Sequence, residues 1–253
     1  MSSKKELVTL SNELTRAVYT MSLSEKRLLF KAVSQFDTYG EPNQVIEVNA
    51  LECARLYEMN QKSAYRVLSE ASESLWNRTL VLKDGTRMRW LISSKYNSGS
   101  IEITFHPDLN SHLLNLSSRF TQYLLSRAAS FKLLYTWRLF ELIMQFKNTG
   151  YLKIDLDEFK EILEIPEYYS EDFSRIRLKV IEPAIKEIKD KDGMNVRWKP
   201  IKSGRRVVAI EFKFPIEKQE VIKFDDNKYI EENARPGETY DQARKRLFTD
   251  KKQ

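Results

Sequence analysis

The chain has 253 residues, 42% of them hydrophobic, which is enough for one large domain or two domains of ordinary size. The net charge of +6 makes a polyanion a natural partner, but acidic residues are also abundant, so the binding charge must be localised. The sequence has no long apolar run, so we expect no membrane span and no secretory signal. A cytoplasmic protein is expected. The one cysteine, Cys53, excludes an internal disulfide and is expected to be buried and unreactive.

The first half of the chain alternates between helical and β-type patterns. Helices are expected at residues 25–36, 50–57, 61–76 and 108–116, and strands at residues 7–10, 45–48, 79–83, 86–92 and 101–105. Ser22 or Ser24 can cap the first helix and Asn49 the second. Asp84-Gly85 predicts a hairpin between the strands that flank it. In the third helix Tyr65, Leu68, Ala71 and Leu75 are expected to face inward.

The second half repeats this type of pattern after a mixed connector at residues 119–130. Helices are expected at residues 132–146, from about 155 to 163 and from about 170, followed by strands at 194–199 and 205–214, with a short strand at 152–154. Pro183 lies inside the last of these helices, which either kinks there or restarts with the proline in its first turn. Residues 215–236 are typical of a linker, and residues 238–248 of a short basic helix.

Both halves share one order of elements: helix, short strand, helix, turn, longer helix, strand, turn, strand. The second copy begins about 110 residues after the first, which favours two similar domains over a coincidence in a generic α+β chain. Each copy is a helix-turn-helix followed by a β-hairpin, the winged-helix plan. We therefore expect an α+β fold with tandem winged helices at residues 1–118 and 119–214, and a linker with a C-terminal helical tail at 215–253.

The longer helix of a helix-turn-helix places its N-terminal part in the major groove of DNA, and the hairpin follows it at once. The side chains of the second copy expected to contact double-stranded DNA are Ser174, Arg175, Arg177, Lys179, Lys202, Arg205 and Arg206. At 100° per residue Arg175 and Lys179 share a polar face, whereas Arg177 falls on the apolar side. The alternative is an ordinary solvated charged face.

The first copy is less basic, and its expected contacts are Lys62, Arg66, Lys83 and Arg87. These side chains suit phosphate contacts more than base reading. A dimer interface on the strands of this copy is the competing use.

Catalytic patterns are weak. The only histidines, His106 and His112, lack the spacing of a metal pair and are expected at the surface. No phosphate-binding Gly-x-x-x-x-Gly-Lys-Ser/Thr loop occurs. The sequence therefore predicts no enzyme, no metal and no cofactor.

Five segments together resemble the Rep initiator proteins of iteron plasmids, a family with two winged-helix domains. They are residues 10–14 (Leu-Ser-Asn-Glu-Leu), 21–29, 119–123 (Arg-Phe-Thr-Gln-Tyr), 179–188 and 204–212. The resemblance covers about residues 7–214. Members usually have an unbroken basic run before the segment that contains Pro183, whereas here Leu178 interrupts it.

The resemblance implies that monomers bind directly repeated origin sequences, open an adjacent A·T-rich region and recruit host replication proteins, with chaperones as further partners. It also implies a homodimer in equilibrium with the monomer, which represses its own gene through an operator. We therefore expect a sequence-specific DNA-binding initiator of plasmid replication without catalytic activity. The alternatives are a plain transcriptional repressor, a DNA-nicking enzyme, and an interaction scaffold that uses the C-terminal helix.

Overall fold

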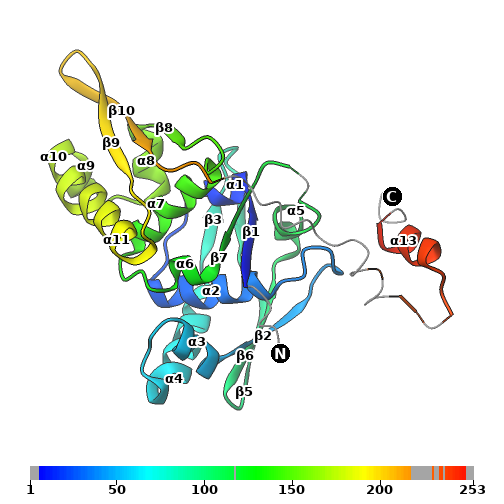
Figure 1. Cartoon of the computed structure of the whole chain (residues 1–253). Helices are drawn as coiled ribbons and strands as arrows, with labels where there is room; N and C mark the ends of the chain where they lie inside the picture. The colour runs from blue at the N-terminus through cyan, green and yellow to red at the C-terminus, as the bar shows by residue number, and fades with distance from the viewer. Residues whose placement is uncertain (1–5, 117, 218–229, 231–233, 236, 249–253) are drawn as a thin grey trace. The chain divides into compact units, whose positions relative to one another are not determined.

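The computed structural model describes residues 6–116, 118–217, 230, 234–235 and 237–248. The chain divides into two compact units, residues 1–216 and residues 217–253. The first unit contains two copies of one arrangement, in which helices accompany a three-stranded antiparallel sheet (Figure 1).

The first copy starts with α2 (Leu23–Gln35), whose N-terminus is fixed by a capping box between Ser22 and Glu25. Its other elements are β2 (Val45–Asn49), α3 (Ala50–Leu56), α4 (Gln61–Trp76), β5 (Leu91–Asn97) and β6 (Ser100–Phe105). The side chain of Asn49 accepts from the backbone N–H groups of Leu51 and Glu52 and so begins α3, as predicted. In the sheet β6 lies between β2 and β5.

The second copy repeats the order. Its elements are α7 (Leu134–Gln145), β8 (Tyr151–Asp155), α8 (Leu156–Ile162), α9 (Glu167–Ser170), α10 (Phe173–Ile176), α11 (Glu182–Asp192), β9 (Arg197–Ser203) and β10 (Arg206–Lys213). Here too the last strand, β10, lies between the other two. Because α2 begins at residue 23 and α7 at residue 134, the copies are offset by 111 residues. The two predicted winged helices are confirmed.

Smaller elements lie outside the two repeated sheets. The strand β1 (Leu7–Ser11) pairs antiparallel with β7 (Phe120–Leu124), so the start of the chain lies beside the segment between the copies. The hairpin of β3 (Thr79–Val81) and β4 (Arg87–Arg89) surrounds Asp84-Gly85 as predicted. The single strand expected at 86–92 is wrong, because β4 ends at Arg89 and Leu91 begins a separate strand, β5, which pairs with β6. The remaining short elements are α1 (Asn12–Thr15), η1 (Pro107–Leu109), α5 (Asn110–Leu113) and α6 (Leu125–Ala129).

One hydrophobic core runs through both copies. Trp137 of α7 is fully buried, and its ring packs edge-on against Phe30 of α2 with the centroids 5.6 Å apart. The ring of Tyr57, which follows α3, lies 6.3 Å from the same tryptophan. Aromatic pairs of this kind contribute about 0.5–1.5 kcal/mol beyond the area that they bury. The two copies therefore stabilise each other.

A buried polar network also joins the copies. The Nζ atom of Lys26 in α2 lies 2.9 Å from Oε2 of Glu141 in α7, and both side chains are at most 1% exposed. The Glu141 carboxylate also accepts from the hydroxyl of Tyr123 at 3.1 Å and from Arg138 at 3.3 Å. Burial lowers the pKa of Lys26 to about 7, and the neighbouring Glu141 carboxylate opposes this shift. One carboxylate therefore compensates two buried cations.

The guanidinium of Arg138 is satisfied by acceptors from several elements. It donates to the backbone carbonyls of Ala17 at 2.8 Å and Ile162 at 3.0 Å, and to the hydroxyl of Tyr19 at 2.6 Å. Since Ala17 and Tyr19 precede α2 and Ile162 is the last residue of α8, the network ties the segment before the first copy to the second copy.

The second unit contains α13 (Tyr240–Phe248), which confirms the short basic helix predicted at 238–248. Arg246 pairs with Glu238 at 2.7 Å, and the hydrogen bond from this arginine lowers the pKa of Glu238 to about 2. The predicted linker lies mostly outside the described residues. Within the described part of the chain, no helix is both long and apolar enough to span a bilayer.

Candidate nucleic-acid interface

The basic helix of the second copy is continuous over residues 173–192. It begins at Asp172, whose carboxylate accepts the backbone N–H of Ser174 at 2.8 Å. The ring of Phe173 lies 6.1 Å from that of Trp198 in β9. The first turn of the helix is therefore fixed both by its cap and by the hairpin.

A π-helical turn interrupts the regular spacing of this helix at Arg177–Ile181. The N–H of Glu182 donates to the carbonyl of Arg177, five residues earlier instead of four. Pro183 follows in the first turn of α11, and a proline there has no N–H to donate to the preceding turn. Pro183 therefore lies in the first turn of a helical segment, as one of the two alternatives expected. The helix does not restart there, however, because it continues through the π turn.

The exposure of Arg177 differs from the expectation for a regular helix. In a regular helix Arg177 falls on the apolar side, but here it begins the π turn and its side chain is 47% exposed. Arg177 is therefore not buried, although the projection of a regular helix puts it on the apolar side. The buried side chains of this helix are Ile176, Val180, Ile181, Ala184 and Ile188. Between the first two of them, three consecutive residues, 177–179, are exposed.

The outward face carries three cations after the exposed Ser174. Arg175 donates from Nη1 to the carbonyl of Tyr168 in α9 at 2.8 Å. The Nε atom of Arg177 lies 3.5 Å from Oε1 of Glu182, and both side chains are about half exposed. An exposed pair of this kind contributes only about 0–1 kcal/mol, so a phosphate can replace the carboxylate. Lys179 forms no hydrogen bond or ion pair with any residue that the structure describes.

The hairpin of β9 and β10 projects beyond α10 in Figure 1 as a yellow and orange ribbon. The chain turns at Gly204, whose φ of +59° lies in the left-handed region that glycine adopts without strain. Lys202, Arg205 and Arg206 surround this tip and are exposed. The helix face and the hairpin tip together present six cations on neighbouring elements, an arrangement that suits a groove of duplex DNA and its phosphates.

The corresponding helix of the first copy, α4, is less cationic. Lys62 is exposed in its first turn, while Arg66 pairs with Glu70 at 3.0 Å. Tyr65 was predicted to face the core, and this was wrong: it is 37% exposed, and the neighbouring Ala64 is buried in its place. The small side chain of Ala64 takes the inward position, and the side chain of Tyr65 faces outward.

Lys83 and Arg87 are exposed on the β3–β4 hairpin, apart from Lys62 and Arg66. This hairpin is not the wing of the first copy, because β5 and β6 complete the three-stranded sheet. The Nζ atom of Lys83 lies 3.8 Å from Oε1 of Glu158 in α8, so the hairpin reaches the second copy. The sequence interpretation missed the β5–β6 hairpin, although Asn97-Ser98-Gly99 is a typical turn sequence.

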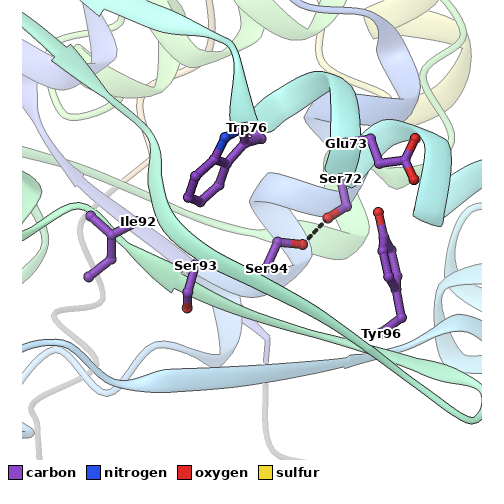
Figure 2. A pocket seen from close by; sticks show the side chains of 7 residues that line it. All are labelled: Ser72, Glu73, Trp76, Ile92, Ser93, Ser94 and Tyr96. Atoms are coloured by element: carbon purple, nitrogen blue, oxygen red, sulfur yellow. Dashed lines mark hydrogen bonds between the residues drawn. The ribbon is translucent and has the colours of Figure 1, made fainter.

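A pocket of about 440 Å³ lies between the outer face of α4 and β5 (Figure 2). Trp76, Ile92 and Tyr96 line it and are each about 40% exposed. The hydroxyls of Ser72 and Ser94 bond each other at its floor. Among the described strands β5 has a neighbour on one side only, so the pocket borders an open sheet edge. Sequence reasoning missed this surface because it did not foresee β5.

The two histidines and the cysteine have structural surroundings in the fold. His112 is buried and not at the surface as predicted, since its Nδ1 atom lies 2.8 Å from the hydroxyl of Ser11, and burial lowers its pKa. His106 caps η1. Burial raises the pKa of the Cys53 thiol to about 12, which confirms a buried, unreactive cysteine. No group of three potential metal ligands occurs among the described residues.

Comparison with known proteins gives consistent matches. The family model described as Initiator Replication protein, WH1, matches residues 7–144, and the model Initiator Rep protein, WH2, matches residues 155–214. A replication initiation protein of Escherichia coli is 25% identical over 88% of this chain and 74% of its own length. The PI protein of Escherichia coli is 25% identical over 86% of this chain and 85% of its own. The crystal structure of Pi initiator protein in complex with iteron DNA aligns with a TM-score of 0.74 at 23% identity, over 85% of this chain and 99% of that one.

Proposed function

The chain belongs to the family of initiator replication proteins with two winged-helix domains, and from this we propose that it initiates plasmid replication by binding directly repeated DNA at an origin. The observation that carries the proposal is the set of six cations on the outward face of residues 174–179 and at the tip of the β9–β10 hairpin. Relatives named as initiators, one of them solved with iteron DNA, support the same reading.

Within this proposal the two copies have different tasks. Ser174, Arg175, Arg177 and Lys179 lie on the helix that enters the major groove and read base edges there, and the hairpin cations Lys202, Arg205 and Arg206 grip phosphates. In the first copy Lys62, Arg66, Lys83 and Arg87 contact backbone phosphates. We assign the first winged helix to residues 1–118 and the second to residues 119–214. No catalytic residue or cofactor is assigned, and host replication proteins and chaperones supply the later steps.

A footprint on the DNA that flanks the gene tests this function. We expect protection of direct repeats, and an association constant that falls with salt with a log–log slope of about −5, because each neutralised phosphate contributes about −0.9. Protection of an inverted repeat alone favours a plain repressor, and absence of protection contradicts specific binding. Cleavage of a supercoiled origin plasmid by the chain with Mg²⁺ would favour the nicking alternative.

We further propose that the free chain forms a homodimer in equilibrium with the monomer, and that the dimer represses its own gene at an operator. The surface that supports this is the pocket beside β5. The open edge strand β5 carries the apolar side chains Ile92 and Tyr96, and Trp76 of α4 lies beside them. An uncovered edge of this kind favours aggregation. A second copy can cover it symmetrically, with the same surface on both partners.

Two matched substitutions test the dimer. Ile92→Lys adds a charge on β5, whereas Val45→Lys adds the same charge on β2, the opposite edge of the sheet, where Val45 is 65% exposed. In sedimentation velocity over a concentration series, Ile92→Lys is expected to raise the dimer dissociation constant about 10–100-fold, and Val45→Lys to leave it unchanged. Equal dimerisation of both variants and the wild type would place the interface elsewhere.

A further inference from the structure

Leu178 stands at the centre of the basic face, between Arg177 and Lys179, and is 51% exposed. A single exposed leucine is ordinary on a protein surface. Its position is less ordinary: Leu178 lies in the π turn, and the residues before and after it are exposed cations. It lies within two turns of the Asp172 cap, in the part of the helix that approaches base edges in a helix-turn-helix.

The major groove offers an apolar side chain few partners. Its edges consist of ring nitrogens, carbonyl oxygens and amino groups, and covering these with leucine removes their water without supplying a hydrogen bond. The exception is the C5-methyl group of thymine, which is apolar and protrudes into the groove. A leucine held between two cations is thus suited to a thymine within a polar contact region.

We propose that Leu178 determines specificity at one position of the DNA site by packing against the C5-methyl group of a thymine. The inference rests on the proposed function, because it requires that residues 174–179 enter the major groove. Arg177 and Lys179 then bind neighbouring bases or phosphates and so position the helix. Leu178, which lies between these two residues in the chain, distinguishes thymine from the other three bases. The interruption of the basic run is, on this view, a reading element.

The test uses deoxyuridine, which differs from thymidine only by that methyl group. Duplexes bound by the full chain are selected from a random-sequence library, and each thymine of the selected site is then replaced singly by deoxyuridine. At one position the wild type is expected to lose affinity about 3–10-fold, the effect of one buried methyl group. Leu178→Ala is expected to bind the thymine site more weakly and to show no further loss on replacement of that thymine.

Leu51→Ala provides the control, because Leu51 is 48% exposed on α3, outside the proposed reading helix. It should retain the wild-type pattern of sensitivity at every thymine. If the wild type is insensitive at all thymines, or if Leu178→Ala keeps the wild-type sensitivity, the inference is overturned while specific binding stands. If the library yields no enriched sequence, the proposed function itself fails.

Discussion

Glu141→Ala is expected to lower the free energy of unfolding by about 3–5 kcal/mol, because removal of one partner from a buried ion pair leaves an uncompensated charge. The full loss is expected because the same carboxylate compensates both Lys26 and Arg138. The side chains of these two cations are at most 4% exposed, so water cannot take over the role of the carboxylate. The hydroxyl of Tyr123 loses its acceptor as well.

Urea unfolding followed by circular dichroism measures this effect. Glu161→Ala is the matched control: it removes a glutamate from the exposed face of α8, and its effect should stay within about 0.5 kcal/mol. A decrease below about 1 kcal/mol for Glu141→Ala would mean that the network does not hold the two copies together.

The double substitution Arg175→Glu, Lys179→Glu is expected to weaken binding to the repeat-bearing DNA at least about 1,000-fold. Loss of each contact alone costs about 1–3 kcal/mol, and each new carboxylate adds repulsion from the phosphates. Both side chains are exposed, and neither belongs to the core, so the fold should tolerate the change.

A second double substitution on the same helix tests whether the position of the lost cations matters or only the net charge of the chain. Lys189→Glu, Lys191→Glu changes the charge by the same amount, at two exposed lysines in the last turns of α11. Electrophoretic mobility shifts at two salt concentrations should show a loss below about 10-fold for this control. Equal losses for the two pairs would mean that only overall charge matters, and would remove residues 174–179 from the reading surface.

Local rules predicted much of the fold. The caps at Ser22 and Asn49 stand where hydroxyl and amide side chains precede apolar helical patterns, and both make the expected backbone hydrogen bonds. The duplication was also visible, because each copy needs the same order of elements to bury one face of its helices. The basic helix and hairpin follow from that order, and so does the proposed interface.

What the sequence did not predict depends on contacts between distant residues. His112 is buried because β1 brings Ser11 to it, 101 residues away in the chain. Val208 precedes the buried Ile210 by two residues in β10, but a register shift between Val207 and Ala209 leaves it 45% exposed. The π turn at Arg177–Ile181 lies directly before Pro183, whose missing N–H is a sign in the sequence that the preceding turn departs from regular hydrogen bonding.

The pairing of β1 with β7 has a consequence for synthesis on the ribosome. Leu7 pairs with Leu124, so β1 leaves the exit tunnel and waits for a partner more than a hundred residues downstream. At about 5–20 residues per second, this delay is roughly 6–23 s. The carboxylate that neutralises Lys26 arrives later still, at residue 141. During translation, therefore, the first winged helix does not complete its structure before the second has begun to emerge, and the two mature together.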